Sequence, residues 1–170
     1  MNAFTISPVT ESDVPALLSL IRELAEFEHL THEVVTDEAL LRAALFGERP
    51  VATALLARVA EAVAGYAVYY RTFSTFVGRT GVYLEDIYVR PQFRQQGVGR
   101  AMLEAVAKAS IELGGGRLEW TALNWNENAL RFYRGLGAHV LDEWALLRMT
   151  GGEVRQFVDG KGPAGKPAGS

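Results

Sequence analysis

The stretch that most constrains the fold is a strand, a loop and a helix that follow one another between residues 82 and 113. Residues 82–89 (VYLEDIYV) form an apolar, β-rich run that Pro91 ends. Gly97-Val98-Gly99 then opens an amphipathic stretch, which three consecutive glycines at 114–116 bring to a stop. The chain therefore has to place a glycine turn and the start of a helix shortly after a strand.

A glycine turn at the start of a helix is suited to holding an anion. The first backbone N–H groups of a helix have no partner within it, and the helix dipole favours negative charge there. Glycines let the main chain come close to a ligand, and Arg94 and Arg100 add positive charge on either side. A pyrophosphate is a natural occupant. An ordinary tight turn is the alternative, because Met102 replaces the third glycine of a Rossmann fingerprint and no Gly-Lys-Ser/Thr of a P-loop is present.

The rest of the chain alternates between short apolar runs and amphipathic stretches. This pattern predicts an α/β fold, with a mixed sheet and helices on its faces. We expect strands over residues 4–9, 51–59, 62–73, 82–89 and 117–123, and one or two closing strands over 139–149. We expect helices after the capping-box-like stretch from Thr10 to Asp13, from Thr36 or Asp37 to Gly47, from Gly97 to Leu113, and from Glu127 to Leu136.

The end of the chain has a different composition. The tail GKGPAGKPAGS is rich in glycine, proline, alanine and lysine and cannot bury much apolar surface. We therefore expect a single domain over residues 1–158 and a disordered tail over residues 159–170.

The composition excludes several kinds of chemistry. The 170 residues include no cysteine, which rules out disulfides, thiolate metal sites and a cysteine nucleophile. The formal net charge of −3 provides no basic field for nucleic acid. No run of about 18 apolar residues and no secretory-type start is present. We therefore expect a cytoplasmic protein that binds neither nucleic acid nor a membrane.

A second motif lies one helix and one strand after the glycine turn, where residues 124–138 read NWNENALRFYRGLGA. The two stretches together resemble the GNAT superfamily of N-acetyltransferases, which carries Arg/Gln-x-x-Gly-x-Gly/Ala and, further on, Asn-x-x-Ala-x-x-Phe-Tyr-x-x-x-Gly. Residues 94–99 match the first motif, and the second is matched by Asn126, Ala129, Phe132, Tyr133 and Gly137. The resemblance covers residues 4–150.

The resemblance implies a fold and an activity. The GNAT fold has a central, twisted, mostly antiparallel sheet of about six or seven strands, with parallel, splayed fourth and fifth strands and about four flanking helices. The implied activity is transfer of an acetyl group from acetyl-CoA to a primary amine, by direct attack in a ternary complex. A protein or peptide N-acetyltransferase and a non-catalytic acyl-CoA-binding module on the same scaffold are the alternatives.

Within the superfamily, the sequence is similar to the diamine acetyltransferases, which include the spermidine/spermine and thialysine enzymes. The stretches YLEDIYVRPQFRQQGVG and LNWNENALRFYRGLGA carry this similarity. The branch implies a homodimer and a small cationic substrate, either a diamine or polyamine or a lysine-like amino acid. One stretch departs from it, because Phe73-Ser74-Thr75-Phe76 contains no acidic residue where the branch carries a Tyr-Asp-Pro-Trp-like sequence. A long polyamine would lack one carboxylate contact, so smaller amines and amino acids stay open.

Two residues are candidates for the proton transfers of this reaction. Tyr133 keeps its proton at neutral pH, because tyrosine has a pKa of about 10, and can donate it to a leaving thiolate. It shares one helical face with Asn126 and Ala129, and core packing is its alternative role. Glu85 matches the glutamate that is the proposed base of the diamine branch. Side chains alternate along a strand, so we expect Glu85 and Asp86 to point to opposite faces, with a structural hydrogen-bonding role for Asp86.

The resemblance also implies which residues bind the two substrates. Those expected to contact acetyl-CoA are the main chain of Ile87, Tyr88 and Val89, the turn residues Arg94, Gln95, Gln96, Gly97, Val98, Gly99 and Arg100, and Asn126, Asn128, Ala129 and Tyr133 of the second motif. Those expected to contact the amine are Phe27, Glu28, Glu85, Glu119, Trp120, Thr121 and Glu143. We expect no bound metal, since His29, His32 and Glu33 are scattered candidates with no fourth ligand.

Overall fold

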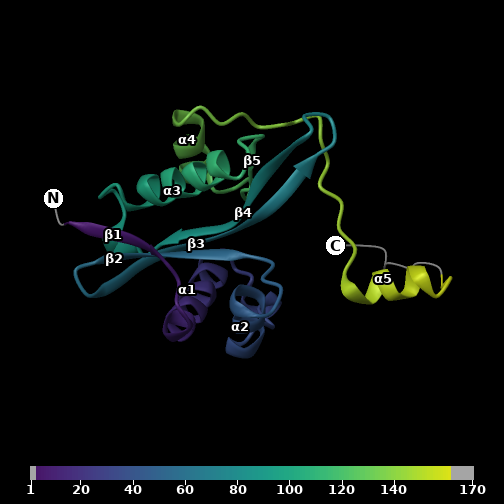
Figure 1. Cartoon of the computed structure of the whole chain (residues 1–170), viewed down its shortest axis with the longest axis horizontal. Helices are drawn as coiled ribbons and strands as arrows, with labels where there is room; N and C mark the ends of the chain where they lie inside the picture. The colour runs from purple at the N-terminus through teal and green to yellow at the C-terminus, as the bar shows by residue number, and fades with distance from the viewer. Residues whose placement is uncertain (1–2, 162–170) are drawn as a thin grey trace. The chain divides into compact units, whose positions relative to one another are not determined.

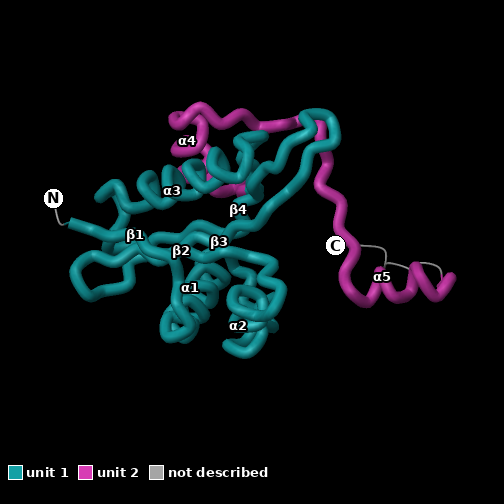
Figure 2. Tube along the Cα trace, viewed as in Figure 1, with its two compact units in different colours: residues 1–121 teal, residues 122–170 magenta. Residues whose placement is uncertain are grey.

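The computed structural model describes residues 3–161, and the chain divides into two compact units (Figure 2). The first unit holds residues 1–121 and the second holds residues 122–170. A single domain over residues 1–158 stays a prediction. Most of the predicted disordered tail, residues 162–170, lies outside the described residues.

A five-stranded sheet forms the centre of the first unit (Figure 1). Its strands lie in the order β1-β2-β3-β4-β5, with bounds Phe4–Pro8, Thr53–Val59, Ala62–Ser74, Arg79–Val89 and Leu118–Glu119. Neighbouring strands are antiparallel except β4 and β5, which are parallel. The predicted mixed sheet and its parallel fourth and fifth strands are confirmed. The predicted six or seven strands are too many, since residues 3–161 contain five.

Helices cover both faces of this sheet. Helices α1 (Val14–Phe27) and α2 (Glu38–Phe46) lie on one face, and α3 (Val98–Glu112) lies on the other (Figure 1). Asp37 is the residue that caps α2, because its Oδ1 accepts a hydrogen bond of 2.8 Å from the Leu40 N–H. The predicted helix starts and ends in this unit are thereby confirmed to within one residue at Gly47 and Gly97.

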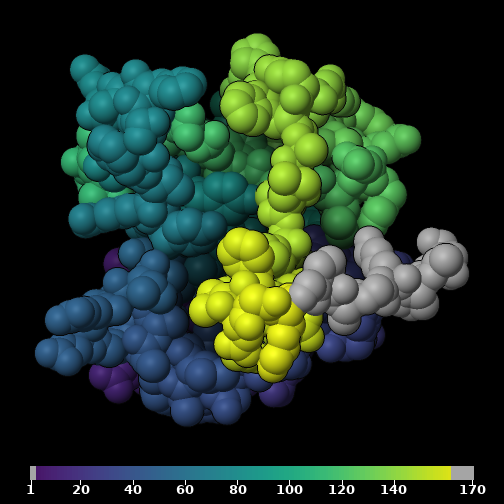
Figure 3. All heavy atoms as spheres, turned by 90° about the vertical axis from the view of Figure 1, so that its right-hand side faces the viewer, coloured from purple at the N-terminus to yellow at the C-terminus, as the bar shows by residue number. Residues whose placement is uncertain are grey.

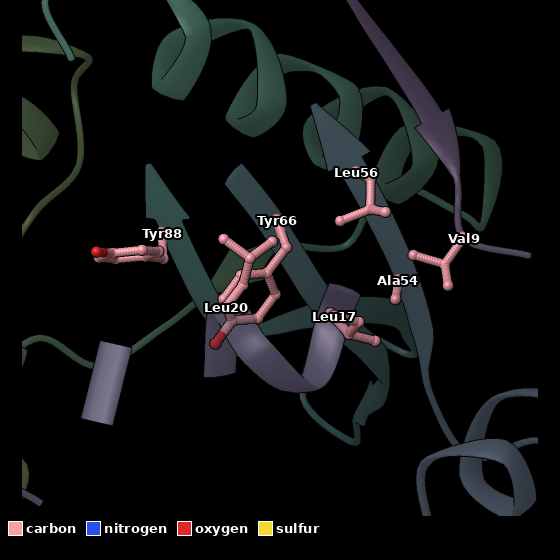
Figure 4. Packing of buried hydrophobic residues seen from close by; sticks show 7 residues of the cluster. All are labelled: Val9, Leu17, Leu20, Ala54, Leu56, Tyr66 and Tyr88. Atoms are coloured by element: carbon pink, nitrogen blue, oxygen red, sulfur yellow. The ribbon is translucent and has the colours of Figure 1, made fainter. Parts of the chain in front are cut away.

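The hydrophobic core has one cluster on each face of the sheet. Beneath α1, the buried residues are Val9, Leu17, Leu20, Ala54, Leu56, Tyr66 and Tyr88 (Figure 4). Beneath α3, they are Ala57, Val59, Ala64, Val98 and Met102. Met102, which stands where a dinucleotide-binding turn would need glycine, is fully buried in this second cluster. Its side chain therefore fixes α3 against the sheet.

The second unit contains α4 (Glu127–Gly135), an extended segment and α5 (Gly151–Val158), with both helices labelled in Figure 1. In Figure 3 the last described residues are yellow. The predicted strand over residues 117–123 shrinks to two residues, and residues 139–149 form no strand. An apolar run becomes a strand only where another strand pairs with it, and no described strand pairs with this one. No helix among the described residues is both long and apolar enough to cross a bilayer.

Helix α5 was not expected from the sequence. A capping box begins it, in which the Thr150 N–H donates to Glu153 Oε2 at 2.6 Å and the Glu153 N–H donates to Thr150 Oγ1 at 3.4 Å. The signal Thr-x-x-Glu was present in the sequence, followed by the apolar residues Val154, Phe157 and Val158. The signal did not lead to a helix prediction, because only three apolar residues follow it before the polar tail begins.

Gly65 offers a test of how closely β3 and β4 pack. A Cβ atom at this position would lie 2.3 Å from the Tyr88 carbonyl oxygen, in the part of the sheet where Gly65 pairs with Val89. We expect Gly65→Ala to lower the free energy of unfolding by about 1–3 kcal/mol, because the backbone of β4 has to move. Urea denaturation measures this. The matched control is Gly99→Ala, whose Cβ would meet only Val89 Cγ2 at 3.6 Å. Equal stability of Gly65→Ala and the wild type would contradict the close approach.

Candidate active site

A β-bulge in β4 determines where the predicted base lies. Val68 of β3 pairs with Asp86, whereas the next residue, Tyr69, pairs with Leu84, so Glu85 is an extra residue without a partner on β3. Glu85 is exposed and Asp86 is half-buried. The regular alternation that would send the two carboxylates to opposite faces is interrupted at this point.

Asp86 lies in an acidic cluster against α1. Its Oδ2 accepts a hydrogen bond of 3.1 Å from the hydroxyl of Tyr66, which is completely buried. Burial raises the pKa of Asp86 to about 6, opposed by the Tyr66 hydrogen bond and assisted by the negative charges of Glu85 and Glu28. Burial also raises the pKa of Glu28, the residue that follows α1. Asp86 therefore makes the structural hydrogen bond expected of it. It also lies close enough to Glu28 and Glu85 for their negative charges to raise its pKa.

Glu85 lies beside a pair of stacked tyrosines that the sequence did not single out. Tyr70 of β3 and Tyr83 of β4 are paired in register, and their ring centroids are 5.3 Å apart at an interplanar angle of 28°. The Tyr83 hydroxyl lies 3.2 Å from Oγ1 of Thr121. Two of the predicted amine-binding residues, Glu85 and Thr121, are thus connected through these rings. Tyrosine at both positions was visible in the sequence, but only the register places the two rings together.

Arg94 connects the predicted amine pocket to the predicted cofactor loop. Its guanidinium carbon lies 5.1 Å from the ring centroid of Phe27 and 5.7 Å from that of Tyr88. Its Nε donates a hydrogen bond of 2.8 Å to the Val89 carbonyl. Cation–π contacts of this kind contribute about 0.5–2 kcal/mol each. They hold the end of α1, where Phe27 is the last residue, against the chain that enters the glycine turn.

The glycine turn has the backbone expected of an anion site. Gln95 and Gly97 have positive φ values of 60° and 86°, and Gly97 is the residue before α3. Positive φ at alternating residues brings successive N–H groups to one side of the chain, where they can surround an anion. The N–H groups of residues 98–100 are the first of α3 and have no acceptor within the helix. Glycine is needed at 97 because a side chain there would be strained.

Two polar side chains of the turn make only local interactions. The Gln96 amide donates to the Gln92 carbonyl at 2.9 Å, and Arg100 pairs with Glu104 at 3.0 Å. An exposed ion pair four residues apart on a helix contributes about 0.3–0.5 kcal/mol. The Arg100 guanidinium can therefore leave Glu104 for a phosphate at little cost.

The outer edge of β4 beyond Tyr83 is not paired in the sheet. Pairing with β5 covers only Val82 with Leu118 and Tyr83 with Glu119. No described strand pairs with residues 84–89 on that side, which include the predicted pantetheine-binding residues Ile87, Tyr88 and Val89. Backbone N–H and C=O groups on such an edge can bind an extended ligand as a strand would.

Helix α4 of the second unit carries the predicted acid, Tyr133, and has a capping motif at each end. The Asn126 side chain caps the helix by accepting a hydrogen bond of 3.2 Å from the Ala129 N–H. At the other end the Tyr133 carbonyl accepts from the Ala138 N–H at 3.1 Å, and the Gly137 N–H donates to the Arg134 carbonyl at 3.0 Å. With φ of 93° at Gly137, this is a Schellman motif. The asparagine and glycine of the second sequence motif are therefore the two ends of the helix that carries Tyr133.

The remaining predicted site residues are exposed, half-buried or in a local ion pair. Glu119 forms an ion pair of 2.7 Å with Arg117, Trp120 is half-buried, and Asn128 and Glu143 of the second unit are exposed. Within residues 3–161 no three histidine or acidic side chains form a group that could hold a metal ion.

Comparison with known proteins identifies the family. Residues 15–138 match the acetyltransferase (GNAT) family model. The mouse thialysine N-epsilon-acetyltransferase is 40% identical over 169 residues, which cover 93% of this chain and 99% of that protein. The L-ornithine N5-acetyltransferase NATA1 of Arabidopsis thaliana is 32% identical over 195 residues, covering 88% of this chain and 85% of that protein.

Solved structures share the fold at lower identity. An integron cassette protein from the mobile metagenome of V. cholerae has a TM-score of 0.76 at 24% identity, covering 93% of this chain and 98% of its own. An aminoglycoside acetyltransferase from an uncultured soil sample has a TM-score of 0.72 at 19% identity, covering 86% and 95%.

These matches, with the mixed sheet and the glycine turn, define the chain as an N-acetyltransferase. It belongs to the acetyltransferase (GNAT) family, and the predicted resemblance to the branch that includes the thialysine enzymes is confirmed.

The raised pKa of Asp86 predicts how stability depends on pH. The unfolded chain releases this proton near pH 3.8, whereas the folded chain holds it to about pH 6, so wild-type stability falls as the pH rises through that window. Asp86→Asn removes this pH-dependent loss of stability, because asparagine does not ionise. Its side-chain oxygen can still accept the hydrogen bond from the Tyr66 hydroxyl. We expect the stability of Asp86→Asn relative to wild type to increase by up to about 3 kcal/mol between pH 4 and pH 7. Urea unfolding at four pH values measures the difference, and parallel curves would show that Asp86 is not buried as described.

Proposed function

We propose that this chain transfers the acetyl group of acetyl-CoA to a primary amine of a small cationic substrate. One observation carries the proposal: β4 presents a carboxylate, Glu85, at its bulge and leads directly into the anion-binding glycine turn. Glu85 of β4 would thus bind the cationic amine, and the turn that follows the strand would bind the pyrophosphate. The mouse relative is named for thialysine and the Arabidopsis relative for ornithine, which supports a short amino acid with a side-chain amine.

The proposed reaction requires proton transfers at the amine and at the leaving thiolate. A lysine-like amine has a pKa of about 10.4 and must lose a proton before it attacks. Glu85 accepts that proton, directly or through water. The neutral amine then forms the C–N bond to the thioester carbonyl carbon, and the C–S bond breaks. Tyr133 gives its proton to the departing thiolate, and the surplus proton on the new amide nitrogen returns to the Tyr133 phenolate or passes to water.

The residues proposed to hold acetyl-CoA divide into backbone and side-chain groups. Backbone N–H groups of residues 95–100 bind the pyrophosphate, and the unpaired edge at residues 87–89 binds the pantetheine arm. Asn126, Asn128 and Ala129 contribute from α4, and Arg94 acts by holding the loop against Phe27.

The residues proposed to bind the amine favour a short substrate over a long polyamine. We propose that Phe27, Glu28, Glu85 and the segment Glu119 to Thr121 contact the amine, and the sequence resemblance assigns the same role to Glu143. The β3–β4 hairpin end lacks an acidic residue between 73 and 76, and Phe76 there is 98% exposed. A distal ammonium of a long polyamine would meet an apolar tip there rather than a carboxylate.

Substitution of the two proposed catalytic residues tests their roles. We expect Glu85→Gln and Tyr133→Phe each to lower kcat by about 10²–10⁴-fold, because each removes one proton transfer. Steady-state kinetics with acetyl-CoA and thialysine or ornithine measure this, with Glu61→Gln in the β2–β3 turn as an exposed control. CoA binding by calorimetry should be unchanged in Glu85→Gln. Wild-type kcat in both variants would contradict the assignment.

A substrate screen separates this function from its alternatives. Acetyl-CoA consumption is measured with thialysine, lysine, ornithine, diamines, polyamines and peptides. Turnover confined to peptides would favour a protein N-acetyltransferase, and CoA binding without any turnover would favour a non-catalytic module.

We also propose a homodimer, whose formation can be measured directly. The segment over residues 139–149 is strongly apolar, with Trp144, Leu146 and Leu147 exposed to 73%, 72% and 89%. Such a segment is normally covered in an assembly. We expect light scattering to give the mass of two chains, and Leu146→Ser with Leu147→Ser to reduce it to one. Leu40→Ser, at an exposed leucine of α2, is the control. A wild-type mass of one chain would contradict the proposal.

A further inference from the structure

The bulge at Glu85 leaves the predicted base without support from its own sheet. An extra residue in a strand has no directly opposite neighbour to fix the direction of its side chain. A general base has to present its carboxylate to the substrate at hydrogen-bonding distance. Another side chain must therefore hold Glu85 in place if it is to act as a base.

The stacked tyrosines supply such a support. Tyr70 and Tyr83 are both half-buried, and their offset stack holds each ring in one orientation. One end of the stack is fixed by the contact between Tyr83 and Thr121 at 3.2 Å, on the segment that follows β5. At the other end is Tyr70, which pairs with Tyr83 two residues before Glu85 and whose hydroxyl interacts with the Glu85 side chain.

We propose that Tyr70 is a positioning residue for Glu85, held in place by its stack on Tyr83 and the hydrogen bond from Tyr83 to Thr121. This inference rests on the proposed function, because it assigns Tyr70 a role only if Glu85 acts on an amine. Tyr70 itself does not take part in the proton transfer. It fixes which carboxylate oxygen faces the incoming ammonium.

The electrostatics around Tyr70 support this arrangement. Burial, then the negative charge of Glu85, and further a hydrogen bond to Glu85 raise the pKa of Tyr70. The hydroxyl therefore keeps its proton at neutral pH and can donate it to the carboxylate. The other acidic groups in this neighbourhood are Asp86, next to Glu85 on β4, and Glu28 of α1. Both would repel the Glu85 carboxylate, so a donor is needed to hold it.

A titration measures the contact independently of any activity. In protein labelled with ¹³C at the tyrosine Cζ, we expect Glu85→Gln to lower the pKa of Tyr70, because the carboxylate charge that raises it is removed. The control is Glu104→Gln, an exposed carboxylate on α3, which should leave the Tyr70 titration unchanged. An unchanged Tyr70 titration in Glu85→Gln would overturn the proposed contact.

A double-mutant cycle then measures the positioning role. We expect Tyr70→Phe to lower kcat/KM for the amine about 10-fold, the size expected for one hydrogen bond to a charged group, while leaving KM for acetyl-CoA unchanged. In a Glu85→Gln background the same substitution should have no further effect. Tyr83→Phe keeps the stack and loses only the contact to Thr121, so it should cost less than Tyr70→Phe.

The outcomes distinguish the two proposals. If the wild type acetylates no amine, or Glu85→Gln is as active as wild type, the proposed function fails whatever Tyr70 does. If Glu85→Gln is impaired but Tyr70→Phe is as active as wild type, only the positioning role is overturned. An equal loss from Tyr70→Phe in the wild-type and Glu85→Gln backgrounds would also overturn it, because a purely structural effect is additive.

Discussion

The β-bulge at Glu85 is the irregularity on which the arrangement of the candidate site depends. In a regular strand, Asp86 and Tyr83 would lie on opposite faces, since they are three residues apart. Because one residue of β4 is unpaired, Asp86 pairs with Val68 and Tyr83 pairs with Tyr70, and these two β3 residues share a face. The bulge therefore places Asp86, Tyr70 and Tyr83 on one face of the sheet, the face that packs against α1.

This arrangement is costly, and the surrounding structure offsets the cost. A half-buried carboxylate at Asp86 destabilises the fold once it is ionised, and its hydrogen bond to Tyr66 compensates only in part. Stability comes from elsewhere along the same strands. Arg90, which follows β4, donates to both carboxylate oxygens of Glu23 on α1, at 2.6 and 2.9 Å, and to the Val63 carbonyl at 2.8 Å. These bonds hold α1 and its terminal Glu28 against the sheet, so the acidic cluster keeps its geometry.

The turns and helix ends could be predicted from the sequence, because they depend on the residues at those positions alone. Gly97 was recognisable since only glycine adopts its backbone without strain, and Asn126 and Gly137 since they are the cap and the Schellman glycine of α4. Glu85 could be selected as a candidate, but the bulge around it could not, because YLEDIYV reads as a regular strand. The pairing of Tyr70 with Tyr83 depends on that register. The closing strands were wrong because strand formation over 139–149 depends on a partner that the sequence does not specify.

Arg94 makes contacts in the structure that its place in the sequence motif does not reveal. From the sequence, this arginine beside a glycine turn suggests a phosphate ligand. In the structure its guanidinium lies over Phe27 and Tyr88, and its Nε donates to Val89. The proposed anion binding at the turn would then depend mainly on backbone N–H groups, which need the positive φ of Gly97 more than any particular side chain. Arg94 connects the end of α1 to the loop, so the proposed amine-binding and cofactor-binding regions of the first unit share one side chain.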